Sequence, residues 1–391
     1  MIRRRRAIRR SDLPAESNGR CDEGWDALFP GRLLRWYAAR KRDLPWRRTR
    51  DPYRVWVSEI MLQQTTVGAV IPYYNAWLRA FPDLQTLARA PLQKVLKAWE
   101  GLGYYQRARN MRRTARIIRD RCGGRFPEDP ADLAALPGFG PYTAAAVASL
   151  AFHRPVPVVE ANVRRVMTRM LGLAGPPGAG RDAAIARFLE KRISRRSPGN
   201  FNQAMMEWGA LVCRPKNPLC LKCPGQNFCR AFARGEQDVL PAPKTLRPKD
   251  ITAVVAVIRK NGRVLLQKRP ETGLLAGLWE FPGGKVEAGE TLRAALRREL
   301  REERGFAVES ARPLMTVRHS YTRFRVTLHA FDVTIAGPGG PRPPDFRGDS
   351  SVRWVSLGAL DRYPLSLIHI SEPTRLLSKS YAVFCLKKKK T

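Results

Sequence analysis

The stretch "LPGFGPYTAAAVASLAF" (136–152) places a glycine-rich turn directly before an alanine-rich helix. Gly138 and Gly140 permit tight backbone geometry, because glycine has no Cβ to clash. The backbone N–H groups of the turn and the N-terminus of the helix together favour a bound anion. A Gly-x-Gly turn alone is more often a plain helix connector, so its meaning depends on the surrounding sequence.

The residues around this turn are helical in pattern. Periodic apolar stretches such as "GRLLRWYAARK" (31–41), "VWVSEIMLQQTTVGAVIPYYNAWLRAF" (55–81) and "LQKVLKAWEGLGY" (92–104) are separated by proline and glycine. They predict an all-helical domain over residues 25–232.

The pattern changes after a proline-rich, charged segment at 233–249, which is typical of a linker. Two β-rich runs flank Asn261-Gly262, a hairpin signal, and a helix and a further strand follow at 290–305 and 323–335. We therefore expect a second domain, of the α+β class, over 250–364.

Both ends of the chain differ from the two domains. Residues 1–24 are basic and lack an apolar signal segment, so we expect a disordered tail or a phosphate-binding arm. Residues 365–391 resemble translated sequencing-adapter sequence, and we expect them to be non-native. From Ser366 this segment holds six Lys/Arg and one Glu, so its removal leaves 37 − 5 = +32.

The net charge of +37 indicates a polyanionic partner, for which nucleic acid is the first candidate. The apolar runs are too short and interrupted for a membrane span. Four of the seven cysteines fall within 17 residues, which is a cluster rather than a disulfide framework and indicates a reducing cytosol.

The clustered cysteines have the spacing Cys213-x6-Cys220-x2-Cys223-x5-Cys229. Four thiolates suit Zn²⁺ or a [4Fe–4S] cluster. Structural zinc sites usually join two short knuckles across a longer gap, whereas these ligands share one compact loop. The basic residues of the loop, Arg214, Lys216 and Lys222, are candidates for phosphate contacts.

Several motifs together resemble the MutY-type adenine DNA glycosylase family of the endonuclease III-like superfamily. They are "LPWR" (44–47), "DPYRVWVSEIMLQQTTV" (51–67), "GLGYYQRARN" (101–110), the 136–152 turn, "MEWGALVC" (206–213) and the cysteine loop. The resemblance implies a helix-hairpin-helix domain, a [4Fe–4S] cluster on the four cysteines, and removal of adenine paired with 8-oxoguanine or guanine in double-stranded DNA.

Cleavage of an N-glycosidic bond needs an acid for the leaving base and a carboxylate that stabilises positive charge on the sugar. Glu59 lies in an apolar helical turn, where burial would raise its pKa and suit it to the acid role. By resemblance the second carboxylate is Glu160, followed by Asn162, although the family has Asp at position 160. The extra methylene moves the charge by about 1 Å, and a misplacement of that size costs about 10²-fold in rate. Altered activity, near-inactivity and a sequence error are all open.

The resemblance also assigns the surroundings of the target base. Bifunctional relatives have Lys where this chain has Tyr142, so we predict a monofunctional enzyme that leaves an abasic site. Tyr142, Glu207, Trp46 and Arg47 are implied to line the adenine pocket. The residues implied near the opposite base are Gln64, Thr65, Leu102 and Tyr104; Tyr105 is equally well explained as a core residue.

The second domain contains a complete Nudix pattern, from Gly284 to Phe306. Glu299, Glu302 and Glu303 are spaced to share one helix face, which can hold Mg²⁺ against a diphosphate. In the glycosylase family the corresponding domain recognises 8-oxoguanine, and we favour that role. The family's lesion-reading loop corresponds to Tyr321-Thr322-Arg323, where Thr322 keeps a hydroxyl.

Three functions are therefore weighed. The first is an adenine glycosylase, acting as a monomer on DNA in the bacterial cytoplasm. The second is a nucleotide-diphosphate hydrolase tethered to DNA, and the third is a lesion-binding protein in which Glu160 prevents excision.

Overall fold

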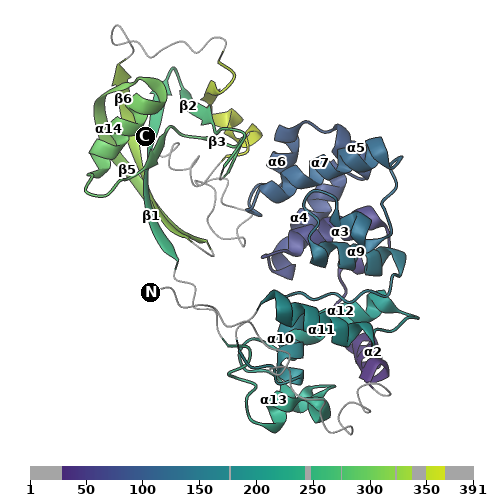
Figure 1. Ribbon diagram of the computed structural model, residues 1–391. Helices are drawn as coiled ribbons and strands as arrows, with labels where there is room; N and C mark the ends of the chain where they lie inside the picture. The colour runs from purple at the N-terminus through teal and green to yellow at the C-terminus, as the bar shows by residue number, and fades with distance from the viewer. Residues whose placement is uncertain are drawn as a thin grey trace, which may run out of the picture. The chain divides into compact units, whose positions relative to one another are not determined.

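The computed structural model describes residues 29–175, 178–242, 248–273, 275–321, 324–336 and 349–365. By packing, the chain divides into two units (Figure 1). The first unit contains 29–60 and 125–242 of the described residues, and the second contains 61–124 and 248–365. The helical part of the chain thus contributes to both units.

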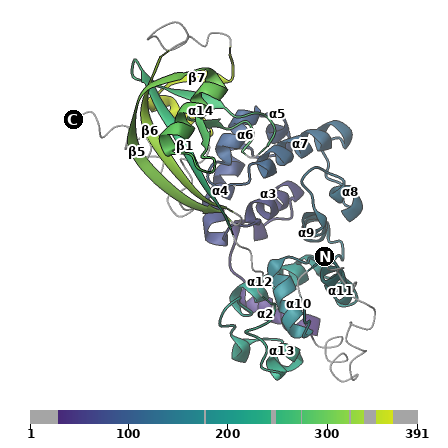
Figure 2. The ribbon, with the colours of Figure 1, turned by 60° about the vertical axis from the view of Figure 1, so that its left-hand side comes forward.

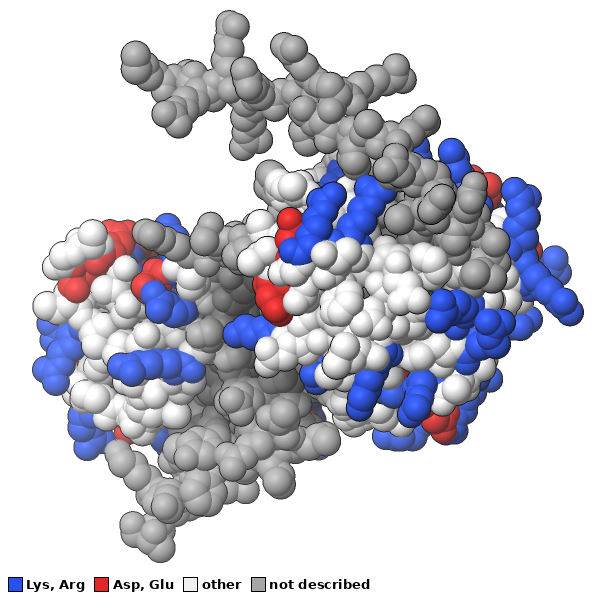
Figure 3. Space-filling view, turned by 90° about the horizontal axis from the view of Figure 1, so that it is seen from below, with Lys and Arg blue, Asp and Glu red and all other residues white. Residues whose placement is uncertain are grey.

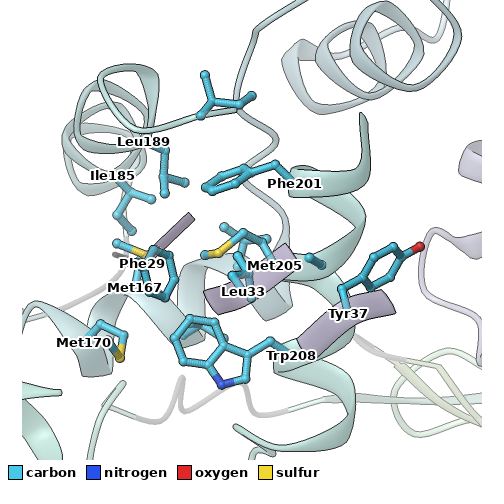
Figure 4. Packing of buried hydrophobic residues seen from close by; sticks show 14 of the residues in the cluster. Phe29, Leu33, Tyr37, Met167, Met170, Ile185, Leu189, Phe201, Met205 and Trp208 are labelled. Atoms are coloured by element: carbon cyan, nitrogen blue, oxygen red, sulfur yellow. The ribbon is translucent and has the colours of Figure 1, made fainter. Parts of the chain in front are cut away.

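The first unit is helical and is built around α12 (Pro198–Leu211), which packs against α2 (Phe29–Arg40), α9 (Pro141–Phe152) and α10 (Ala161–Met170). Its core joins Phe29, Leu33, Met167, Phe201 and Trp208, among others (Figure 4). The remaining helices of this unit are α3 (Pro52–Leu62, to residue 60), α8 (Pro130–Ala134), α11 (Ala179–Glu190), α13 (Arg230–Ala233) and the 3₁₀ turns η2 (Pro45–Arg47), η3 (Cys220–Lys222) and η4 (Gln226–Phe228).

The glycine-rich turn connects α8 to α9, so the predicted helical hairpin is confirmed. Gly138 has φ +82°, a left-handed conformation that glycine adopts without strain. Gly140 is the N-cap of α9, and Pro141 occupies its first turn, where a missing N–H costs nothing.

The helices of the second unit that precede its sheet are α4 (Val67–Ala80), α5 (Leu84–Arg89), α6 (Leu92–Ala98) and α7 (Gln106–Arg121). The apolar stretch 55–81 is not one helix, because the chain turns at Gln64, which has φ +62°. The turn ends α3 and begins α4, and it presents Gln64 and Thr65 on a loop.

The rest of the second unit is a mixed sheet with the strand order β3-β2-β1-β6-β5. Its strands are β1 (Lys249–Lys260), β2 (Arg263–Lys268), β3 (Trp279–Glu280), β4 (Gly283–Lys285), β5 (Ala307–Tyr321), β6 (Phe324–Ala336) and β7 (Val352–Ser356). Strands β1 and β6 are parallel, whereas β1 and β2 form the predicted antiparallel hairpin. Asn261 and Gly262 both have positive φ, as this two-residue turn requires.

Alternate residues of β1 enter two cores on opposite faces of the sheet. Val254, Ala256 and Ile258 pack with α14 (Leu292–Arg304), which lies against the sheet in Figure 2. Val257 joins a second core with Trp279 and the 3₁₀ turn η5 (Leu357–Arg362). Strand β1 begins at Lys249, the last residue of the predicted linker. Leu365 is buried in the second core, and the remainder of the suspected non-native tail lies outside the described residues.

Candidate active site

The first unit brings Glu59, Tyr142 and Glu160 together from three helices. Glu59 lies on α3 and is 3% exposed, and the Tyr142 hydroxyl at the start of α9 donates a hydrogen bond to its Oε2. Glu160 is close enough for its charge to raise the pKa of both Glu59 and Tyr142. The structure therefore assembles the two predicted carboxylates around one phenol.

Glu59 is poised to exchange a proton near neutral pH. Burial raises its pKa to about 7; the hydrogen bond from Tyr142 lowers it, and the charge of Glu160 raises it further. Burial and the Glu59 charge raise the pKa of Tyr142 well above its usual value, so the phenol stays protonated as a donor. A carboxyl group tuned in this way suits general acid catalysis.

Glu160 is the N-cap of α10. Its Oε1 accepts from the Val163 backbone N–H at 3.0 Å, and its Oε2 accepts from the Asn162 side-chain amide at 3.2 Å. Burial raises the pKa of Glu160, while the backbone hydrogen bonds at Asn162 and Val163 and the charge of Arg165 oppose the rise. Capping thus holds the longer carboxylate at the helix end, where the N-terminal dipole favours its ionised form.

Arg165 connects this carboxylate turn to the cysteine loop. Its Nη2 donates to Asn162 Oδ1 at 2.7 Å and its Nε donates to the Cys213 carbonyl at 2.8 Å. Another bond from Nη2 reaches the Gly209 carbonyl at 2.8 Å. Through Arg165, the start of the cysteine loop therefore supports the position of Asn162, which in turn donates to Glu160.

Glu207 forms a second charged group with Arg42 and Arg47. It is fully buried on α12 and accepts hydrogen bonds of 2.6–3.0 Å from both guanidinium groups and from the Arg42 backbone N–H. Burial alone would raise the pKa of Glu207, but these hydrogen bonds outweigh it and hold the pKa at about 2. The charge of Arg47 also lowers the pKa of Glu59, so Arg47 is near enough to act on both carboxyl groups.

Of the predicted pocket residues, Arg47 and Glu207 are hydrogen-bonded to each other, and Trp46 is buried next to Arg47 in the 3₁₀ turn η2. The sequence did not single out Arg42 or Arg165. Arg42 binds Glu207, which lies 165 positions away, and Arg165 binds the Cys213 carbonyl, which lies 48 positions away. The local signal was only that Arg42 shortly precedes the quoted motif "LPWR" (44–47) and that Arg165 shortly follows Asn162.

In the second unit, Arg107 holds together the two loops predicted near the opposite base. Its guanidinium donates to the carbonyls of Gln63 and Leu102 at 2.7 and 3.0 Å and lies over the Tyr104 ring. Burial lowers the pKa of Arg107 to about 10. Gln64 and Thr65 are thereby held near the 101–104 loop, and Arg107 is another residue that was not predicted.

The aromatic residues of the second loop differ in exposure. Tyr104 is 48% exposed, whereas Tyr105 and Leu102 are 4% and 7% exposed. Tyr105 is thus a core residue, and Tyr104 is the more exposed aromatic side chain of this loop.

The four clustered cysteines line one small cavity in the first unit, together with Arg169, Trp208 and Gln237. The described residues contain no group of three or more His, Cys, Asp or Glu side chains arranged around a single metal ion. Burial raises the pKa of Cys223 to about 12, so its sulfur becomes a thiolate at neutral pH only when a metal centre binds it.

Arg169 shows that this cavity suits an anionic group. Its side chain is 2% exposed, and Nη1 donates to Cys213 Sγ at 3.3 Å. Its other hydrogen bonds reach the carbonyls of Leu240, Arg214 and Pro215. Within the described residues none of these acceptors is a carboxylate, so negative charge on the cysteine sulfurs is what would balance the buried guanidinium.

The Nudix carboxylates lie along α14, as the spacing predicted, but they bind side chains of their own domain. Arg298 forms ion pairs with Glu290, Glu299 and Glu302 at 2.8–3.1 Å. Glu303 accepts from Gln267 at 2.7 Å. Thr322 and Arg323 of the predicted lesion-reading loop lie outside the described residues.

Lys and Arg outnumber Asp and Glu on the face shown in Figure 3, in line with the overall charge. No helix in the described ranges combines the length and apolar character needed to cross a bilayer. The described cysteines are free thiols.

Comparison with known proteins agrees with this arrangement. Residues 57–191 match the HhH-GPD superfamily of base excision DNA repair proteins, and residues 253–369 match the NUDIX domain. The adenine DNA glycosylase of Homo sapiens is 36% identical over 82% of this chain and 69% of its own length. The enzyme of Mus musculus is 35% identical over 82% of this chain and 73% of its own length. That of Buchnera aphidicola (Schizaphis graminum strain) is 36% identical over 65% of this chain and 74% of its own length.

The burial of Glu59 predicts a pH-dependent stability. Because its pKa rises from 4.5 to about 7 on folding, the folded state loses stability between these values, by roughly 3 kcal/mol in total. Glu59→Gln removes this loss. Thermal unfolding should show the variant and the parent to be similar near pH 5, with the variant more stable at pH 8.

Glu207→Gln provides the opposite control, because the folded pKa of Glu207 is lowered and its ion pairs stabilise the protein above pH 4.5. This variant should be less stable than the parent at pH 8. An equal effect of both substitutions at pH 8 would contradict the electrostatic assignment.

Proposed function

The chain belongs to the family of adenine DNA glycosylases, DNA N-glycosylases of base excision repair, and we propose that it removes adenine paired with 8-oxoguanine in duplex DNA. The observation that carries the proposal is the buried Glu59, whose pKa is about 7 and whose carboxyl group is hydrogen-bonded to Tyr142 beside Glu160.

In the proposed reaction the adenine leaves the base stack and enters the pocket next to Glu59. Protonated Glu59 gives its proton to the base, which makes adenine a better leaving group. Ionised Glu160 then stabilises the positive charge that develops on the sugar. The two carboxyl groups have different protonation states because their mutual charge and burial raise the pKa of Glu59, whereas the helix cap favours ionised Glu160.

Tyr142 limits the chemistry to hydrolysis. A phenol cannot form the imine with the sugar that a lysine forms, so we propose that the product is an abasic site and that the strand stays intact. The role of Tyr142 is to orient the Glu59 carboxyl group by its hydrogen bond.

For the cysteine loop we propose a [4Fe–4S] cluster bound by Cys213, Cys220, Cys223 and Cys229. The four cysteines come from one compact loop and line one shared cavity. The buried Arg169 donates a hydrogen bond to one of their sulfurs, which suits a group that carries negative charge. A bound cluster would stiffen the loop that supports Arg165 and Asn162.

For the second domain we propose recognition of 8-oxoguanine rather than Mg²⁺-dependent hydrolysis. The pairing of Glu290, Glu299 and Glu302 with Arg298 favours this role, because a metal ion would have to displace that arginine from carboxylates it already neutralises. We further propose that the protein acts as a monomer on DNA in the bacterial cytoplasm.

Substrate choice tests the proposed function. Single-turnover assays should show free adenine released from a duplex with adenine opposite 8-oxoguanine, and slower release opposite guanine. A duplex with adenine opposite thymine should give no adenine, and no strand break should form before alkali treatment. Equal release from all three duplexes would contradict the proposal.

The rate of adenine release should depend on the protonation of Glu59. Because the protonated carboxyl is the active form, the single-turnover rate should fall about tenfold for each pH unit above about 7. Glu59→Gln should reduce the rate by at least about 10² fold and abolish this pH dependence. A rate that is flat from pH 6 to 9 in the parent would assign the acid role to another group.

A further inference from the structure

Trp208 lies against the cysteine loop. It sits on α12, is fully buried in the core of the first unit, and packs on Phe29 with ring centroids 5.5 Å apart (Figure 4). Its indole Nε1 donates a hydrogen bond to Cys223 Sγ at 3.3 Å. The one polar side-chain atom of this core tryptophan is therefore hydrogen-bonded to one of the four clustered cysteine sulfurs.

The orientation of this indole depends on Gly225, two residues after Cys223. A Cβ at position 225 would lie 2.7 Å from Trp208 Cη2 and 2.8 Å from Cζ2. These distances are shorter than carbon atoms allow without movement, so the six-membered ring occupies the space that a side chain at 225 would need. The missing side chain at 225 leaves room for the indole ring, whose N–H donates to the Cys223 sulfur.

We propose that Trp208 is a positioning residue that sets the redox behaviour of the iron–sulfur cluster by its hydrogen bond to Cys223. The inference rests on the [4Fe–4S] cluster of the proposed function. An N–H donor draws electron density from a cluster sulfur and stabilises the more electron-rich state, which raises the reduction potential. Trp208 thereby makes loss of an electron from the bound cluster less favourable.

The magnitude follows from the strength of such bonds. Only the part of the hydrogen-bond strength that differs between the two oxidation states changes the potential. A difference of about 1.4 kcal/mol is tenfold in the ratio of oxidised to reduced cluster, which for a one-electron couple equals about 59 mV.

The test uses the purified full-length protein as it is expressed. Iron and acid-labile sulfide are measured first, and voltammetry on DNA-free protein then follows the one-electron oxidation in which the cluster gives its electron to the electrode. Trp208→Phe keeps an aromatic ring in the core but removes the N–H. At a fixed potential we expect about tenfold more oxidised cluster in this variant than in the parent.

Two further variants separate the hydrogen bond from packing. Trp56→Phe is the matched control, because Trp56 is also buried and its indole N–H has no hydrogen-bond partner among the described residues. Its potential should equal that of the parent. Gly225→Ala should displace the Trp208 indole without removing it, and should lower the potential in the same direction as Trp208→Phe.

The outcomes are distinct. Full iron and sulfide in Trp208→Phe or Gly225→Ala with an unchanged potential would overturn the role of Trp208 and leave the cluster in place. If Trp208→Phe does not fold, the potential of Gly225→Ala decides alone. A parent protein with zinc and no sulfide would overturn the proposed cluster itself, and with it this inference, while adenine release could still be intact.

Discussion

The structure depends on one unfavourable placement, a carboxyl group in the apolar interior of α3. An ionised Glu59 would be costly there, and Glu160 nearby adds a like charge. The protein accepts this cost because it makes the carboxyl group an acid at neutral pH. Tyr142 limits the cost with a hydrogen bond and stays protonated itself. The Glu59 carboxyl group thus has a hydrogen-bond donor that carries no positive charge.

The surrounding contacts fix the charged groups near Glu59, so that its carboxyl group has no cation of its own to pair with among the described residues. Glu207 accepts hydrogen bonds from both Arg42 and Arg47, so Arg47, whose charge acts on Glu59, is already paired with another carboxylate. Asn162 and the start of α10 hold Glu160, and Arg165 ties them to the cysteine loop. Two carboxylates of the same unit thus have opposite pKa shifts, to about 7 for Glu59 and about 2 for Glu207, because only one is given arginines.

Local sequence patterns predicted the features that depend on neighbouring residues, such as turns and the burial of single side chains. Gly138 and Gly140 indicated the hairpin turn, Asn261-Gly262 the strand connection, and the apolar neighbours of Glu59 its burial. The pairings that set the electrostatics were beyond such patterns. Arg42 meets Glu207 across 165 positions, and nothing in the neighbourhood of either residue encodes the other. The exposure of Tyr104 and the burial of Tyr105 likewise depend on the turn of the 101–104 loop and on Arg107. The capping role of Glu160 appears only once the start of α10 is known.

Residue 160 is the catalytic position at which this chain differs from the family, which has the shorter Asp. The most direct measurement is single-turnover adenine release by the parent, Glu160→Asp and Glu160→Gln on a duplex with adenine opposite 8-oxoguanine, with thermal unfolding to confirm that each variant is folded. We expect release by the parent and by Glu160→Asp, which is also a favourable N-cap, and a loss of at least about 10² fold in Glu160→Gln. Release by Glu160→Gln at the parent rate, or release by Glu160→Asp alone, would contradict the proposed role of Glu160.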